Sequence, residues 1–350
     1  ENDDGVKLRD AFRGGLEAYG SLDGHKYVLP QSGPMPNGFV YSHKMFTEHG
    51  WKVPETVDEL FELVDRINND PVNKDANPNN DIAPFAFGGQ VMAYWNAVVQ
   101  LWANQYDGVE KVKAFYEDPK LENYLYENRA GAMEALKIFE RLICTGEGKP
   151  QNAIQGAMGK SHILMQNDFV QGKAAMISGI YGVVNETKNI IDDDFDMRMF
   201  FPAIDGAEKG KDGKPLLINA ANEFDFMFIA KASNVKDYAK KFLLWVSTQD
   251  MAKSYLENTA SFPPYKFDVE KVENVTSLTR SQLEYLNDNF VTVMGVNEHP
   301  LTQYGKITFW PAGEPYTDMV IANKSVKRSI DDQYGYASSQ WSDWCKDAGL

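Results

Sequence analysis

Apolar residues recur with two different periods along the chain. They repeat every three or four positions across residues 57–67 and 130–144, which predicts two amphipathic helices. Other apolar runs are bounded by glycine or proline and have the length of buried strands, and these lie at 82–87, 172–179, 195–201 and 216–230. Strands that alternate with helices are typical of the α/β fold class, which we therefore expect here.

Several signals place the ends of the helices. Thr56 stands before the helix at 57–67 and Glu59 stands three residues later, which is the pattern of a reciprocal capping box. Further helices are expected at 91–105, which is unusually aromatic, and at 181–191. We also expect a helix that is capped by Asn234 and has an apolar face made of Val235, Tyr238, Ala239, Phe242, Leu243 and Val246.

A proline-rich segment divides the first part of the chain. Two short apolar runs with strand character flank residues 30–38, which contain three prolines and two glycines. Proline fixes φ and donates no hydrogen bond, so this segment suits an extended crossing between two lobes better than a tight hairpin. Two similar crossings are expected, near 262–265 and near 216–223.

The length and charge of the chain narrow the class of protein. At 350 residues it exceeds the roughly 250–300 residues over which one hydrophobic core keeps growing, so two domains are expected. The formal net charge of −15 argues against nucleic acid as a partner, because binding to phosphates needs basic surface. No apolar run approaches the roughly 20 residues that span a bilayer. Cys144 and Cys345 lie far apart, and we expect both to be unpaired.

Motifs of catalysis are missing from the sequence. It contains no glycine-rich nucleotide loop, no HExxH or CxxC metal motif and no GxSxG nucleophile elbow. A carboxylate pair for glycoside hydrolysis has no local signature, so a carbohydrate-active hydrolase stays open as an alternative. We expect a protein that is not an enzyme.

One spacing is typical of a calcium loop. Side-chain oxygens occur at every second position in a short polar segment, on Asp75, Asn77, Asn79 and Asp81. An EF-hand would have glycine where Asn80 stands and glutamate where Ala86 stands, so a solvated turn is the alternative. Structural calcium is the one cofactor that the sequence suggests.

Aromatic and amide side chains gather at breaks between the expected elements, which is where open α/β sheets bind their ligands. Neutral polyols need flat apolar rings for their C–H faces, and amides or carboxylates for their hydroxyl groups. Such a set indicates a carbohydrate site, although aromatic residues at helix starts also pack between layers. The candidate ligand-binding residues are Asn37, Gln90, Tyr94, Trp95, Tyr181, Asn222, Glu223 and Trp310.

Six segments resemble those of a known family in their residues and in their order along the chain. They are 24–30 (GHKYVLP), 39–46 (FVYSHKMF), 49–60 (HGWKVPETVDEL), 82–87 (IAPFAF), 172–179 (GKAAMISG) and 262–266 (FPPYK). Through them the chain resembles the extracellular solute-binding proteins of carbohydrate ABC importers, the maltodextrin-binding-like group. Within that group it looks most similar to members that bind amino sugars and oligosaccharides.

The resemblance implies a two-lobed, periplasmic-binding-protein-like fold of type II, with several crossings between the lobes and a sugar site in the cleft. The family's N-terminal segment has no counterpart here, so we expect part of the N-terminal lobe to be missing. Lobe one would keep 1–31 and 216–266, lobe two would comprise 32–215, and hinge and C-terminal helices, mainly on lobe two, would fill 267–350. Family positions also imply sugar-stacking rings at Tyr94, Trp95, Tyr181 and Trp310, and a polar cleft turn at Asn222 and Glu223.

The resemblance further implies a role for the protein. It would be an extracytoplasmic receptor, periplasmic or anchored as a lipoprotein, that works as a monomer. It would deliver a mono- or oligosaccharide to the membrane permease subunits of an ABC importer by closure of the cleft. A receptor of the same fold for a peptide, polyamine or other charged solute is the alternative. The start at Glu1, without an initiator methionine, indicates that a leader was removed or that the sequence is a fragment.

Overall fold

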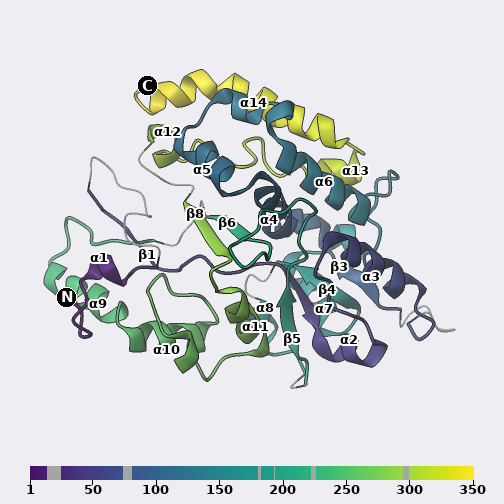
Figure 1. The fold of residues 1–350 in the computed structure, drawn as a ribbon, viewed down its shortest axis with the longest axis horizontal. Coiled ribbons are helices and arrows are strands. Elements are labelled where there is room, and N and C mark those ends of the chain that lie inside the picture. Colours follow the sequence, from purple (N-terminus) through teal and green to yellow (C-terminus); the bar gives the residue numbers. More distant parts are fainter. Residues whose placement is uncertain (14–24, 74–80, 180–182, 193, 222–225, 295–298) are drawn as a thin grey trace.

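The computed structural model describes residues 1–13, 25–73, 81–179, 183–192, 194–221, 226–294 and 299–350. Figure 1 shows a large body built around a mixed sheet, and a small body that holds the N-terminus together with α1, β1, α9 and α10. The strands are β1 (Leu29–Pro30), β2 (Phe39–Ser42), β3 (Ala83–Ala86), β4 (Ala174–Ser178), β5 (Met197–Phe200), β6 (Leu217–Ala221), β7 (Phe226–Met227) and β8 (Phe290–Met294). The helices are α1 (Leu8–Ala11), α2 (His43–His49), α3 (Val57–Asn69), α4 (Asn96–Asp107), α5 (Val109–Glu117), α6 (Ala130–Ile143), α7 (His162–Val170), α8 (Val183–Thr187), α9 (Lys236–Val246), α10 (Gln249–Thr259), α11 (Ser277–Tyr285), α12 (Pro300–Gln303), α13 (Tyr316–Ile321) and α14 (Val326–Asp347).

A four-stranded sheet with the order β3–β4–β2–β5 forms the centre of the large body. β3 and β4 run parallel, whereas β2 runs antiparallel to both β4 and β5. Every residue of β2 and β4 is buried, so both faces of the sheet are covered. Successive side chains point to opposite faces, which places Phe39 and Tyr41 in one hydrophobic core and Val40 in another. The strands predicted at 82–87, 172–179 and 195–201 are therefore confirmed.

Helices α3, α4 and α6 contribute to the larger of these cores. The predicted capping box begins α3, since the Thr56 hydroxyl accepts from the Glu59 N–H and the Glu59 carboxylate accepts from the Thr56 N–H, both at 3.2 Å. α4 and α6 pack so closely that a Cβ atom on Gly131 would lie 2.3 Å from the carbonyl oxygen of Ala103. This close approach fixes the position of α4, whose start leads to the candidate site described below.

The proline-rich segment 30–38 connects two different sheets. It leaves β1, which pairs antiparallel with β7, and it enters β2 of the four-stranded sheet. The segment 262–265 lies beside it, since the Gly33 N–H donates to the Phe262 carbonyl at 2.8 Å. A Cβ atom on Gly33 would lie 2.6 Å from the carbonyl oxygen of Pro263, so this approach requires glycine. The prediction that 30–38 crosses between two parts of the fold is confirmed.

Three element predictions need correction. The strand predicted across 216–230 is two strands with different partners, because β6 pairs parallel with β8 whereas β7 pairs with β1. The helix predicted at 181–191 ends at Thr187 in α8, where the backbone turns and Ile191 N–H donates back to the Thr187 carbonyl. α9 is not capped by Asn234, because its N-cap residue is Val235 and no described side chain caps its first turn.

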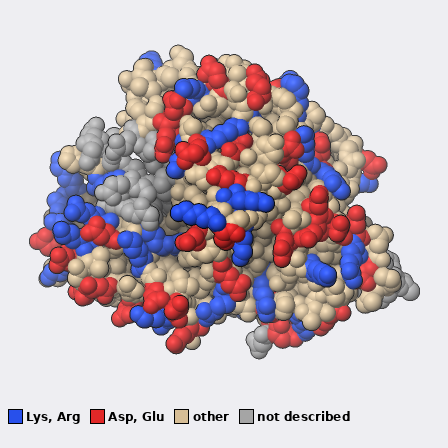
Figure 2. Space-filling view, in the orientation of Figure 1, with Lys and Arg blue, Asp and Glu red and all other residues tan. Residues whose placement is uncertain are grey.

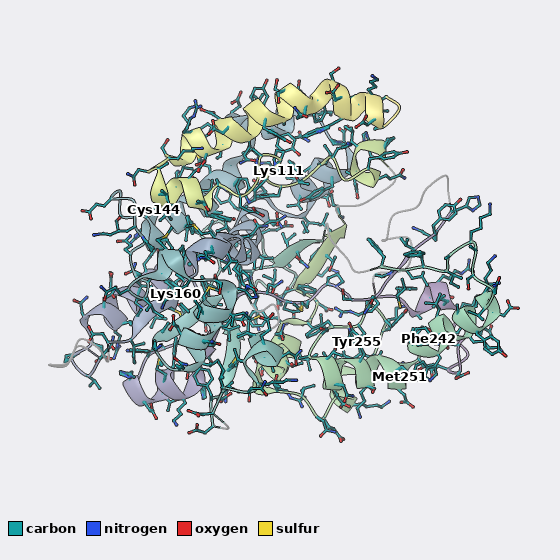
Figure 3. All side chains as sticks on the ribbon, turned by 180° about the vertical axis from the view of Figure 1, so that it is seen from behind. Lys111, Cys144, Lys160, Phe242, Met251 and Tyr255 are labelled. Atoms are coloured by element: carbon teal, nitrogen blue, oxygen red, sulfur yellow. The ribbon has the colours of Figure 1, made fainter. Side chains whose placement is uncertain are left out.

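The apolar face predicted on α9 is not part of a buried core. Val235, Tyr238 and Phe242 are 58%, 75% and 51% exposed, and no residue of the helix is buried. Figure 3 shows Phe242 on the small body, near the labelled residues of α10. One buried cluster of the small body is small, with Ala11, Phe12, Ala252 and Tyr265.

Charged side chains of both signs lie on the surface. Figure 2 shows acidic and basic side chains interspersed over the visible face. Within the described part of the chain, every helix is too short or too polar to cross a membrane. Cys144 and Cys345 are both free thiols, as expected.

Candidate functional site

The carboxyl end of β4 brings together two of the predicted ligand residues. β4 ends at Ser178, and Gly179 follows with a φ of 72° while its N–H donates to the Gly38 carbonyl at 3.0 Å. The turn that contains Asn37 and Gly38 therefore lies beside the turn after β4. A Cβ atom on Gly179 would lie 3.3 Å from the backbone oxygen of Tyr94 and 3.5 Å from its ring. Asn37 and Tyr94 thus reach the same edge of the sheet from distant parts of the sequence.

Two buried oxygen atoms at this edge have no hydrogen-bond partner among the described residues. They are Oδ1 of Asn37, a residue that is 9% exposed, and Oγ of Ser178, which is 1% exposed. A buried polar atom left without a partner costs about 1–3 kcal/mol, and native structures contain few of them. A hydroxyl group of a ligand would supply the missing partner, so the edge has the chemistry of a polar binding site.

Tyr94 gives the site an aromatic ring. It is half-buried and lies nearly parallel to His162, with ring centroids 6.4 Å apart and an interplanar angle of 14°. Burial raises the pKa of the Tyr94 hydroxyl and the charge of Glu186 raises it further, against a smaller opposite effect of the Gln166 amide. The hydroxyl therefore keeps its proton at neutral pH, and it can both donate and accept a hydrogen bond.

Gln90 is exposed and links two loops. Its Nε2 donates to the Gly159 carbonyl at 3.1 Å, and its backbone N–H donates to the Lys160 carbonyl at 3.2 Å. A Cβ atom on the preceding Gly89 would lie 2.4 Å from the backbone of Met158, so the loop after β3 rests directly on the loop before α7. The structure thus assigns Gln90 a structural contact, and its role toward a ligand stays a prediction.

Trp95 is a core residue, which corrects its predicted stacking role. It is 2% exposed, and its ring contacts those of Phe39, Phe85 and Phe139 at centroid distances of 5.7, 5.3 and 5.3 Å. With aromatic rings packed around it, no face of the indole is open to a ligand. The alternative that aromatic residues at helix starts pack between layers applies to Trp95.

Trp310 is also buried in this structure, at 7% exposure. Its Nε1 donates to the Asn96 Oδ1 at 2.8 Å, and the Tyr316 hydroxyl donates to the same oxygen at 3.1 Å. Asn96 is the first residue of α4, so these bonds tie the segment before α13 to the helix that starts beside Tyr94. Trp310 therefore holds the start of α4 in place through Asn96, and the structure leaves it no open ring face for stacking.

The remaining predicted residues lie largely outside the described residues. These are Tyr181, Asn222 and Glu223 of the ligand set, and Asp75, Asn77 and Asn79 of the calcium set. Asp81 is described and half-buried, and the described residues contain no group of three His, Cys, Asp or Glu side chains that could hold a metal ion. Calcium binding therefore stays a prediction.

Sequence reasoning missed several residues at or near this site. Ser178 is not among the predicted ligand residues, although its place at the carboxyl end of a buried strand is a usable signal. His162 begins α7 and lies beside the Tyr94 ring, but no sequence pattern relates these two positions. Asn73, at the opposite end of the sheet, was also missed: its amide donates to the carbonyls of Ile67 and Ile82 at 2.8 and 2.9 Å, which joins the end of α3 to the start of the β3 segment.

Solved structures define the class to which this fold belongs. The chain is similar to a chitin oligosaccharide binding protein, with a TM-score of 0.64, 17% identity, and coverage of 96% of this chain and 76% of that chain. It is similar to apo RafE from Streptococcus pneumoniae, with a TM-score of 0.64, 18% identity, and coverage of 96% of this chain and 77% of that chain. It is also similar to a sugar transporter from Bacillus licheniformis in complex with stachyose, with a TM-score of 0.60, 15% identity, and coverage of 96% of this chain and 79% of that chain. Together they show the two-lobed α/β fold of solute-binding proteins.

The family is established by a second comparison. The model of the bacterial extracellular solute-binding protein family matches residues 1–253, which is more than two-thirds of the chain. The chain belongs to this family. No curated protein sequence matches it. The resemblance expected from the ordered sequence segments is therefore confirmed, together with the fold class.

Proposed function

We propose that this protein is an extracytoplasmic receptor that binds a mono- or oligosaccharide at the carboxyl end of β4 and delivers it to an ABC importer. Membership of the extracellular solute-binding family supports the receptor role. The similar solved structures include proteins described with chitin oligosaccharide, raffinose and stachyose, which supports a carbohydrate ligand. The observation that carries the proposal is the pair of buried oxygens, on Asn37 and Ser178, that have no partner among the described residues and lie at the edge of the sheet that Tyr94 also reaches.

The chemistry of this edge favours a neutral sugar over a charged solute. The two oxygens carry no formal charge, so they match hydroxyl groups and would not neutralise an ammonium group or a carboxylate. The ring of Tyr94 offers an apolar face for the C–H groups of a pyranose. A site built from an amide, a hydroxyl and a protonated phenol holds a sugar without cleaving it, in keeping with a family of binding proteins.

A melting experiment tests the proposal. Binding to the native state stabilises it by about 2.7 kcal/mol when the free ligand is at 100 times its Kd, so a bound sugar raises the melting temperature saturably. We expect such a rise with at least one member of a panel of mono- and oligosaccharides. Tyr94→Ala abolishes the rise, whereas Tyr106→Ala, at a 40% exposed tyrosine on α4, keeps it. Absence of a saturable rise across the panel contradicts a carbohydrate ligand, and release of shortened sugar products would establish a hydrolase instead.

Three finer parts of the proposal have their own measurements. A receptor that works alone sediments as a monomer at micromolar concentration with and without sugar. Delivery to an importer requires that purified permease subunits, with their ATPase, hydrolyse ATP faster in the presence of the sugar-loaded receptor than of the sugar-free one. Structural calcium in the segment that includes Asp75, Asn77, Asn79 and Asp81 predicts a lower melting temperature in a calcium chelator, which Asp75→Asn would mimic.

A further inference from the structure

A cavity of about 460 Å³ lies in the large body, away from the carboxyl end of β4. It is lined by the last turn of α4, by α5 and by the turns between α5 and α6. Tyr94 stands two residues before the start of α4, and the cavity lies at the other end of this 12-residue helix, about 18 Å away at 1.5 Å per residue. Figure 3 shows Lys111, from the wall of the cavity, on the large body.

Arg129 lines this cavity and is a buried cation. It is 4% exposed, and among the described residues no carboxylate lies within ion-pair distance of its guanidinium. The one hydrogen bond that it makes there runs from Nη2 to the Phe309 carbonyl at 2.9 Å. A guanidinium carries five N–H donors in a planar fork, so most of them have no acceptor within the described structure.

Aromatic rings surround the guanidinium but leave these donors unused. Its central carbon lies 4.1 Å from the ring centre of Phe309, 5.2 Å from that of Phe115 and 5.4 Å from that of Trp310. Cation–π attraction offsets part of the cost of burying the charge. Ring faces accept no conventional hydrogen bond, so the N–H groups of Arg129 that have no acceptor among the described residues can bind an added one in the cavity.

The other charges on the wall are mostly paired with each other. Lys111 Nζ lies 2.7 Å from Asp107 Oδ1, and Lys120 Nζ lies 2.5 Å from Asp118 Oδ2. Three basic and four acidic side chains line the cavity, which gives the wall a net charge of −1. A ligand with one negative charge can pair with the buried guanidinium, whereas a second negative charge would meet carboxylates that it cannot avoid. The unpaired acids, both exposed, are Glu122 and Glu127.

We propose that this cavity is a second ligand site, which takes a small hydroxylated monocarboxylate of the size of a uronic acid. The planar carboxylate accepts from the fork of Arg129, which is the geometry that guanidinium groups match best. The hydroxylated remainder faces the amides of Asn104, Asn123 and Asn128, which also line the cavity. The volume is within the range of pockets that enclose small ligands. The site is independent of the receptor site proposed above.

Calorimetric titration tests the second site, with D-glucuronate, D-glucose and inorganic phosphate as probes at low salt. We expect saturable binding of glucuronate, and binding at least tenfold weaker for glucose, which lacks the carboxylate, and for phosphate, which carries more charge. Arg129→Lys keeps the charge but loses the fork, and it should weaken glucuronate binding at least tenfold. Ala114→Trp, at an exposed residue on the wall, narrows the cavity without touching Arg129, and it should weaken binding as well.

The controls separate this site from the structural role of arginine and from the first site. Arg141 lies on α6, the helix that begins directly after Arg129, and its guanidinium carbon lies 3.6 Å from the ring centre of Phe61, but it does not line the cavity. Arg141→Lys should leave the affinity for glucuronate unchanged. Equal binding of glucuronate and glucose, no titratable binding, or an unchanged affinity in either cavity variant overturns the proposal. Loss of glucuronate binding in Tyr94→Ala would also overturn it, because the anion would then bind at the carboxyl end of β4.

Discussion

Ser178→Ala tests whether the Ser178 hydroxyl serves ligand binding or the stability of the fold. The Ser178 hydroxyl is buried at the end of β4 without a partner in the described structure. Ser42, in the neighbouring strand β2, is a matched control: it is equally buried, but its hydroxyl accepts from the Met45 N–H and caps α2. The same substitution therefore removes an unsatisfied hydroxyl at one position and a working cap at the other.

Only one of the two substitutions should lower the free energy of unfolding. Burying a hydroxyl without a hydrogen bond costs about 1–3 kcal/mol in protein mutational data, and loss of its packing offsets part of this gain. Ser178→Ala should therefore leave the ligand-free protein as stable as the parent, or up to about 2 kcal/mol more stable. Loss of an N-cap costs about 1 kcal/mol, so Ser42→Ala should be destabilised by that amount.

Urea unfolding of both variants, without ligand, measures this difference at constant slope. In parallel, the affinity of Ser178→Ala for the sugar found in the melting panel should fall about 3- to 10-fold, the effect of one neutral hydrogen bond. Ser329→Ala, on α14 at another buried hydroxyl without a partner in the described part of the chain, should gain stability without any change in sugar affinity. A loss of stability in Ser178→Ala equal to that in Ser42→Ala would refute the reasoning, because an ordered water would then satisfy the hydroxyl.

Three further predictions concern stability and reactivity. Thr56→Ala removes the capping box of α3 and should lower the free energy of unfolding by about 1 kcal/mol in urea, whereas Glu62→Ala, exposed on the same helix, should change little. Burial alone would raise the pKa of Asp70, but hydrogen bonds from the Val72 N–H, His49 and the Trp51 indole outweigh it and hold this pKa below its ordinary 3.8. A lowered carboxyl pKa contributes stability that is complete above pH 3.8 and is lost as the pH falls through the folded value. Asp70→Asn should therefore be less stable than the parent at pH 7, and the gap should close below about pH 3.8; a gap that is constant down to pH 2 would contradict the linkage. Burial raises the pKa of the Cys144 thiol to about 12, so in a Cys345→Ala variant a thiol reagent at pH 8 should modify Cys144 far more slowly than in urea-unfolded protein, and equal rates would show that the thiol is accessible.

Local signals in the sequence were sufficient for much of the large body. The capping box at Thr56 depends on two residues three positions apart, so it needs no tertiary information. β4 is a continuous apolar run because both of its faces are covered, and such runs are readable directly. Strand pairing is different, since β6 and β8 are separated by more than 60 residues and only tertiary contacts decide that they pair.

The candidate site shows the same limit at the level of single side chains. Asn37 and Tyr94 were predicted from their places at breaks between elements, and the structure brings both to the end of β4. Trp95 had the same sequence context as Tyr94, but adjacent positions at a helix start point in different directions, and the indole turned inward. Arg129 could not be found at all, because its burial depends on rings contributed from α5 and from residues near 309.

The close approach of Gly33 to Pro263 has a mechanical consequence. Both segments lead from the small body to the large one, and they touch backbone to backbone where they cross. Because the two connecting segments are in contact, a change in the backbone torsions of one segment is transmitted to the other. A rotation between the two bodies would therefore involve both segments together, and not a hinge in a single segment. Any side chain at residue 33 would clash with Pro263 and push the two segments apart.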